Sequence, residues 1–344
     1  MSICQNGFTV FLACMGTGLC WLPAANAETG DKESFQLGGL LFGDVYHIAG
    51  HHTAQGDGAT GAVLRRGYLT ANFKLGEAWY GRARIELNQD GEFETYDFEV
   101  DIKDLYLARK FGRQEFVAGL SPPPTFDLIE SMWAARYLMR TPMDLQGVPS
   151  RDTGIALNGP ISADGRWGYR AMLGAGIEFG NESSDGARWM GALTWRSAAD
   201  LIVDLYLDYD RNSGTTDHST VQLFVGKQSE SLRWGVQYSH QDRQDDPRLE
   251  LASGFLVGGI RDKLSVIGRV DRILEPSPKG DNISYIPFDP SARATMLLGG
   301  LEYRYSPTFR VTPNVIWTRY DRNDLSVRPE DDLHLRLTFF LDLE

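Results

Sequence analysis

Cysteine is almost absent from this sequence of 344 residues, and Cys4, Cys14 and Cys20 all lie near the N-terminus. They belong to an apolar stretch that ends in a proline and a small-residue triplet, Ala25-Asn26-Ala27. This pattern predicts a secretory signal peptide over residues 1–27, although its first residues lack Lys and Arg. The remaining chain, residues 28–344, has no cysteine. An exported fold without disulfides needs another source of stability, and a closed hydrogen-bonded sheet would supply one.

Long hydrophobic runs are also missing, because no stretch beyond the predicted signal approaches the ~20 apolar residues of a membrane-spanning helix. Basic residues are few: 34 Lys and Arg stand against 46 Asp and Glu, which gives a net charge of −12. That balance argues against nucleic-acid binding, which requires a basic surface. With 42% hydrophobic and 11% aromatic residues, the chain is too apolar to be disordered. A globular β protein or a membrane β-barrel remains.

The sequence repeatedly alternates apolar and polar residues. In residues 79–88, Trp79, Ile85 and Leu87 occupy one face of a predicted strand, and Arg82, Arg84 and Glu86 the other. Such a strand buries one face in an apolar environment and leaves the other polar. We predict about 16 strands, with 14 or 18 as alternatives, at residues 35–47, 64–74, 78–88, 102–111, 114–120, 152–159, 166–177, 187–196, 200–210, 219–227, 231–241, 249–260, 263–273, 293–304, 309–320 and 333–343.

Connection lengths give a second, independent signal. Connections after even-numbered strands are short, whereas those after odd-numbered strands are mostly long and polar, as at 48–63, 89–101, 122–151 and 274–292. This alternation is typical of an up-and-down barrel in a bacterial outer membrane, and a soluble sandwich has no reason to show it. We therefore predict an all-β fold, a transmembrane antiparallel β-barrel. Tryptophans near strand ends agree with an interfacial girdle: Trp79, Trp167, Trp189, Trp195, Trp234 and Trp317.

A barrel of about 16 strands is too wide for its own side chains to fill, so it leaves an aqueous channel unless a loop narrows it. The third long loop, residues 122–151, is the candidate. Phe126, Ile129, Trp133 and Tyr137 recur at helical spacing after three prolines. This predicts a helix with an aromatic stripe against the inner wall, in a loop too apolar to remain outside.

Three segments resemble the phosphate-selective porins of types O and P. They are the run from Gly119 through the three prolines, the stretch ending in Arg140-Thr141-Pro142, and Arg151-Asp152-Thr153-Gly154. The resemblance covers residues 119–154 closely and the remaining barrel plan loosely. It implies a trimeric outer-membrane channel with its third loop at the narrow zone. Arg151 and Asp152 match the family's return motif, whereas Arg136 and Arg140 lie only in the matching loop. The chain departs in having few lysines to line a pore.

Charged residues of both signs fall on the predicted inner faces. We expect the pore lining and constriction to include Arg82, Arg84, Glu86, Arg136, Arg140, Arg151, Asp152, Arg170, Asp204, Asp208, Arg233 and Arg269. One hypothesis is a transverse field, with arginines on one wall and carboxylates on the other. The alternative is that these charges only hydrate a wide pore. Selectivity depends on the sign and spacing of lining charges, so a balanced lumen gives little ground for strong phosphate preference.

Other clusters suggest other chemistry. His47, His51 and His52 with Asp57 have ligand types that suit zinc or copper, but we interpret them as an exposed polar loop and predict no metal. The acidic groups Asp242, Asp245, Asp246 and Glu330, Asp331, Asp332 lack the spacing of a calcium loop. A serine with His218 or His240 would suggest a hydrolase, yet no Gly-x-Ser-x-Gly motif accompanies them. We predict no enzyme and no cofactor.

Two functions remain open. The first is an outer-membrane porin for passive diffusion of small hydrophilic solutes or ions, with a preference for anions expected at the third loop. The second is a structural or adhesive barrel in which the third loop plugs the lumen. Either would lie in the lipid bilayer after insertion by outer-membrane assembly machinery, with a homotrimer expected for the porin and no nucleic-acid partner.

Overall fold

The protein is described by a computed structural model covering residues 33–89, 98–176, 186–211, 217–244 and 246–343. The predicted signal peptide lies outside these residues. No helix among them is long and apolar enough to cross a membrane.

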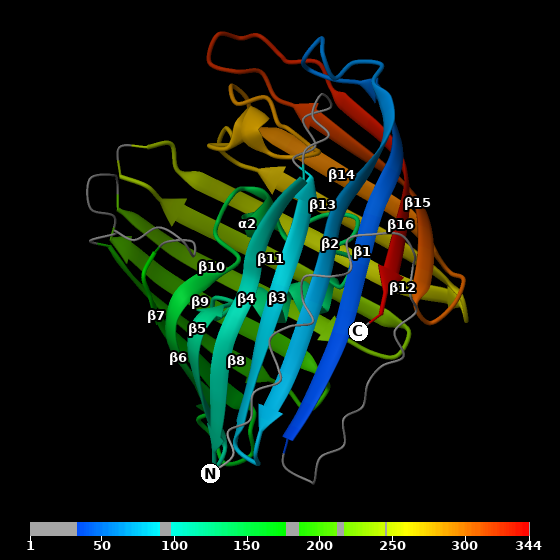
Figure 1. Cartoon of the computed structure of the whole chain (residues 1–344). Helices are drawn as coiled ribbons and strands as arrows, with labels where there is room; N and C mark the ends of the chain where they lie inside the picture. Colours follow the sequence, from blue (N-terminus) through cyan, green and yellow to red (C-terminus); the bar gives the residue numbers. More distant parts are fainter. Residues whose placement is uncertain (1–32, 90–97, 177–185, 212–216, 245, 344) are drawn as a thin grey trace.

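Sixteen antiparallel strands form one closed barrel in which each strand pairs with its sequence neighbours and β1 pairs with β16 (Figure 1). The strands are β1 (Glu33–Gly50), β2 (Thr60–Leu75), β3 (Trp79–Gln89), β4 (Phe98–Phe111), β5 (Gln114–Ser121), β6 (Asp152–Pro160), β7 (Trp167–Gly174), β8 (Ala187–Arg196), β9 (Leu201–Arg211), β10 (His218–Gln228), β11 (Leu232–Asp242), β12 (Leu249–Arg261), β13 (Leu264–Ile273), β14 (Ala294–Arg304), β15 (Phe309–Tyr320) and β16 (Asp332–Asp342). The predicted fold class and strand count are confirmed.

The period-two pattern divides each strand between the outside and the lumen. In β16, Leu335 and Leu337 face outward and are exposed, whereas His334, Arg336 and Thr338 face inward and are buried. Exposed leucine, isoleucine and valine residues recur in this way around the barrel. An apolar outer belt over a polar interior is the surface that a bilayer requires.

The two ends of the barrel differ. At the short-turn end, the connections use residues with positive φ, such as Gly76, Gly112 and Asp200. The long loops gather at the other end, drawn at the top of Figure 1. We call these the short-turn end and the long-loop end.

Two long loops fold into the lumen. The third loop, residues 122–151, carries helices α1 (Phe126–Trp133) and α2 (Pro142–Leu145), and α2 is drawn within the barrel in Figure 1. The seventh loop, residues 274–293, carries the short 3-10 helix η2 (Gly280–Asn282). Side chains of both loops join one hydrophobic core with the inner faces of β12–β16, including Leu251, Met296 and Ile316. On this side of the lumen the two loops therefore cover an apolar inner wall.

Candidate functional site

Helix α1 begins one residue after three consecutive prolines and is shorter than predicted. Pro124 restrains the chain before the N-cap Thr125, and Asp127 in the first turn complements the positive helix N-terminus. The helix ends at Trp133 because Ala134 is left-handed, with a φ of 47°, and its N–H donates to the Glu130 carbonyl at 2.7 Å. Tyr137, expected on the helical stripe, lies beyond this end and is buried.

The third loop is anchored to strands on several sides of the barrel. The Thr125 hydroxyl donates to Asp204 of β9 at 3.0 Å, and the Tyr137 hydroxyl donates to Glu302 of β14 at 2.6 Å. Arg65 of β2 donates to the carbonyls of Tyr137 and Leu138. These contacts use barrel side chains to satisfy loop groups that water would otherwise solvate. The loop is thus fixed across the lumen rather than lying over the rim.

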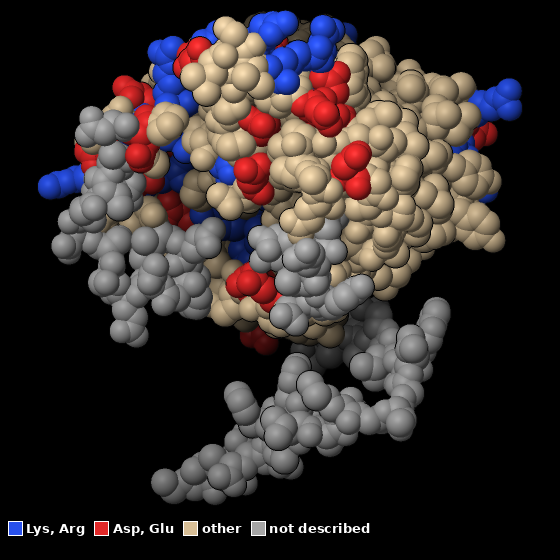
Figure 2. All heavy atoms as spheres, turned by 90° about the horizontal axis from the view of Figure 1, so that it is seen from above, with Lys and Arg blue, Asp and Glu red and all other residues tan. Residues whose placement is uncertain are grey.

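Between the third loop and the short turns lies a cavity of about 1000 Å³. Nine of its lining residues are basic: Arg82, Arg84, Lys103, Arg136, Arg151, Arg233, Arg261, Arg304 and Arg310. Six are acidic: Asp127, Glu130, Glu230, Asp262, Glu302 and Asp342. The cavity lining therefore carries a formal excess of 9 − 6 = 3 positive charges, whereas the whole chain carries −12. Seen from the long-loop end, side chains of both signs lie around the rim, and further basic side chains are visible deeper in a hollow (Figure 2).

Five of the twelve predicted pore residues line this cavity. Arg82 bonds Asn72 at 2.8 Å and Arg84 bonds Thr70 at 2.9 Å, both within the wall. In the third loop, Arg136 pairs with Glu130 at 3.1 Å and Asp144 at 2.5 Å. The other two cavity-lining residues are Arg151, which pairs with Asp104, and Arg233.

These arginines do not form a single wall. Arg84 lies on β3 and Arg233 on β11, which are on opposite sides of a sixteen-strand barrel. The hypothesis of a transverse field, with arginines confined to one wall, is therefore wrong. Each wall mixes both signs.

The other predicted residues serve the scaffold instead. Asp204 pairs with Arg170 at 2.7 Å, and Asp208 pairs with Arg188 at 2.5 Å. Asp152, 1% exposed, lies 3.9 Å from the same Arg188. These carboxylates are enclosed within the wall of β6–β10 and do not line the large cavity.

The last three hold or adjoin the third loop and its surroundings. Glu86 accepts a hydrogen bond from Tyr68 at 3.1 Å and pairs with Lys103 at 2.9 Å. Arg269 pairs with Asp271 and donates to the Arg140 carbonyl. Arg140 itself faces a cavity of about 20 Å³ behind the loop, not the large one.

Sequence reasoning missed Arg65 and Arg66, both of which face the lumen. A β-bulge opposite Gly43 sets two residues of β2 against one of β1, so two consecutive side chains point inward. Arg65 pairs with Asp44 at 2.7 Å, and Arg66 pairs with Glu86. Two adjacent arginines that break the period-two pattern were the only sequence signal for this bulge.

Burial shifts the acidity of third-loop groups. Desolvation by the enclosing barrel raises the pKa values of Asp127 and Glu130, although Arg151 and Arg136, respectively, oppose the shift. Burial lowers the pKa of Arg140 to about 10. The two carboxyl groups on α1 therefore take up protons at a higher pH than free side chains, which makes the cavity charge depend on pH.

The histidine loop differs from its predicted exposed form. His51 is 2% exposed, and His52 contacts Asp332 and Asp281, because the first loop, residues 51–59, folds against β16 and the seventh loop. His47 instead bonds Thr60 at 2.9 Å, and Asp57 is exposed. Asp332 is buried, whereas its neighbour Asp331 pairs with Arg328. Asp245, of the other acidic group, lies outside the described residues.

The sequence matches no known family profile and no curated protein. Solved structures are similar in fold. An anion-selective porin from Comamonas acidovorans aligns with a TM-score of 0.66 at 13% identity, covering 91% of this chain and 100% of that chain. The outer membrane channel DcaP of Acinetobacter baumannii gives 0.64 at 10% identity, covering 93% and 100%. Salmonella typhi OmpF gives 0.63 at 9% identity, covering 90% and 98%. The chain has the fold of porin barrels.

Proposed function

We propose that this chain is an outer-membrane porin, a passive diffusion channel for small hydrophilic solutes that favours anions at the third loop. The observation that carries the proposal is the large cavity with its excess of basic side chains, bounded by a loop that the wall holds in place. Lining charges select ions by their sign and field, so this excess favours anions. The fold shared with an anion-selective porin supports the same assignment.

Phosphate specificity is not part of the proposal. Among the described residues, Lys103 is the single lysine lining the large cavity, and most lining arginines are already paired with carboxylates or wall groups. Such paired charges bias passing ions weakly. We infer a general channel with moderate anion preference.

The apolar outer belt supports a place in the outer membrane, reached through export by the N-terminal segment and insertion by assembly machinery. A homotrimer is the assembly that the resemblance to trimeric porins implies. Each of these is inferred from the fold and the sequence together.

A specific observation favours the second candidate, a loop-plugged structural or adhesive barrel. The third and seventh loops pack into one apolar core against β12–β16, and such a core excludes water from that side of the lumen. The porin proposal requires that solutes pass beside this core, along the wall of β3 and β4.

Planar-bilayer recording of the folded chain separates the candidates. We expect discrete current steps and, in a salt gradient, a reversal potential of the anion-selective sign. Arg82→Glu combined with Arg84→Glu should move that potential toward cations. The matched control Arg166→Glu, in an exposed turn away from the cavity, should leave it unchanged. Persistent absence of steps from correctly folded protein would favour the plugged barrel.

A further inference from the structure

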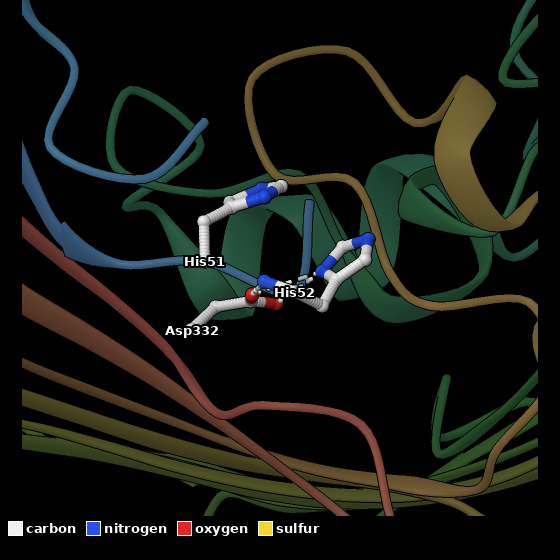
Figure 3. Close-up of side chains that lie close together, drawn as sticks. All are labelled: His51, His52 and Asp332. Carbon is white, nitrogen blue, oxygen red and sulfur yellow. Dashed lines mark hydrogen bonds and ion pairs between the residues drawn. The ribbon is translucent and has the colours of Figure 1, made fainter. Parts of the chain in front are cut away.

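A cluster of titratable side chains lies at the long-loop end, apart from the proposed channel lining. His51 and His52 directly follow the last residue of β1, and Asp332 is the first residue of β16. Because β1 and β16 pair as far as Gly50 and Leu333, this closing seam brings together side chains 280 residues apart. Figure 3 shows His52 and Asp332 directed at one another, with His51 beside them.

The three side chains have the spacing of metal ligands. One candidate ligand atom from each lies within 4.8 Å of the others, and His52 Nδ1 is 2.9 Å from Asp332 Oδ1. Ligand atoms bound at about 2.0–2.1 Å in a tetrahedral site are separated by roughly 3.3 Å. The His52–Asp332 pair is therefore already close to ligand spacing. The His51 ring stacks on His52 with ring centroids 4.4 Å apart and an angle of 24° between the rings, so the His51 side chain must rotate to direct a nitrogen at the same ion.

Surrounding groups hold these side chains in place. The Tyr320 hydroxyl donates to Asp332 Oδ2 at 2.5 Å, and the Thr53 N–H donates to His51 Nδ1 at 3.0 Å. The first loop also closes tightly over His51, since a Cβ on Gly56 would lie 2.5 Å from its Cγ. The Tyr320–Asp332 bond is of the kind that orients a metal ligand. The Thr53 N–H instead occupies the lone pair of His51 Nδ1, so His51 would exchange this bond for the ion.

The donor set selects a class of ion. Two imidazoles and one carboxylate suit zinc and its neighbours in the transition series, whereas calcium and magnesium prefer sites built from oxygen alone. We propose that His51, His52 and Asp332 bind one divalent ion of the zinc class, with water in the remaining position. The ion would take the place of the proton that His52 and Asp332 share.

Such an ion would join the first loop to the start of the last strand. That is the one place where the barrel is closed by strands distant in sequence. Asp281 of the seventh loop, 3.1 Å from His52 Nε2, would remain beside the site as an outer carboxylate. Metal binding is therefore expected to stabilise the barrel seam at its long-loop end as well as the first loop.

The test uses the full chain folded into detergent and treated with a chelator. Titration with Zn²⁺ by calorimetry should show one saturable site per chain. His51→Ala and Asp332→Asn should each weaken binding at least about tenfold, as loss of even an outer partner does elsewhere. His47→Ala is the matched control, because His47 lies on β1 just before the cluster but bonds Thr60 outside it, and this variant should bind Zn²⁺ normally.

Folding of each variant is checked by the heat-dependent gel mobility of the barrel. If a variant does not fold, the unmodified chain still decides: Co²⁺ should give the visible absorption of a site with nitrogen ligands, and excess Ca²⁺ should not displace it. The proposal is overturned if the folded chain shows no saturable Zn²⁺ binding. It is equally overturned if His51→Ala and Asp332→Asn bind Zn²⁺ as the unmodified chain does. His52 would then only bridge Asp332 and Asp281 by hydrogen bonds.

Discussion

The Arg269 guanidinium of β13 lies 5.2 Å from the centre of the Trp133 ring at the end of α1. The same side chain pairs with Asp271 at 2.5 Å, and both members of that pair are almost fully buried. Arg269 also donates to the Arg140 carbonyl, so one residue holds the third loop at two points. The position of the third loop in the lumen therefore depends on the charged side chain of Arg269 in the barrel wall.

Arg269→Gln should loosen the third loop and destabilise the barrel. Removing one partner of a buried ion pair leaves Asp271 uncompensated and costs about 3–5 kcal/mol. Urea unfolding measures this loss, and single-channel recording should show noisier current. Arg272→Gln is the control, because Arg272 pairs with Asp321 in a partly exposed position and should change stability by less than about 1 kcal/mol. Equal effects of the two substitutions would contradict this role for Arg269.

Tyr137→Phe removes the hydroxyl that donates to Glu302. A buried acceptor that loses its donor costs about 1–3 kcal/mol. Glu302 keeps its ion pairs with Arg304 and Arg310, both at 3.5 Å, so the formal charge of the cavity does not change. We expect lower stability in urea with an unchanged reversal potential. Stability equal to that of the unmodified chain would contradict the anchoring role of Tyr137.

Arg136 and Arg140 should differ although both lie in the third loop. Arg136 lines the large cavity, whereas Arg140 faces the small cavity behind the loop. Arg136→Gln should therefore reduce anion selectivity clearly, and Arg140→Gln should do so only slightly. Reversal potentials of the two variants in the same salt gradient provide the comparison. A larger effect at Arg140 would mean that solutes take a different path.

Anion selectivity should increase as the pH falls from neutral. Desolvation by the enclosing barrel raises the pKa values of Asp127 and Glu130, so these groups lose their negative charge at a higher pH than free carboxyl groups do. Neutralisation leaves Arg136 and Arg151 to dominate the cavity. Reversal potentials measured between pH 7 and pH 4 test this, with Glu130→Gln expected to flatten the curve. A pH-independent potential would contradict the assignment.

Gly119→Ala should impair folding. Gly119 has a φ of 123°, and an added Cβ would lie 2.2 Å from the Leu105 carbonyl oxygen. Backbone strain of this kind costs about 1–3 kcal/mol before any clash is relieved. Gly299→Ala is the control, since a Cβ there meets nothing within 4 Å. Folding yields from urea should fall for the first variant and not for the second.

The barrel could be predicted from the sequence because each strand presents one face to an apolar exterior, which imposes period two on the chain. The apolar inner wall could not be predicted so readily. Parts of β12 and β14 have apolar residues on both faces, because the folded loops pack against their inner face. Inward residues such as Leu251 and Met296 therefore weaken the alternation of apolar and polar residues along these strands.

Site residues were harder to place than strands. Arg84 and Asp204 share the same alternating pattern, yet one lines the cavity and the other holds the third loop through Thr125. The two residues differ only in how the third loop runs past them, which the sequence pattern does not show. The approach of His52 to Asp332 arises from barrel closure between the two ends of the chain and has no local sequence signal.

Solute uptake into vesicles tests the central claim most directly. Liposomes containing the folded chain, diluted into isotonic solutions of neutral sugars, should swell with a small monosaccharide and progressively less with larger oligosaccharides. Swelling no faster than that of protein-free liposomes, from barrels shown to be folded and inserted, would contradict a diffusion channel.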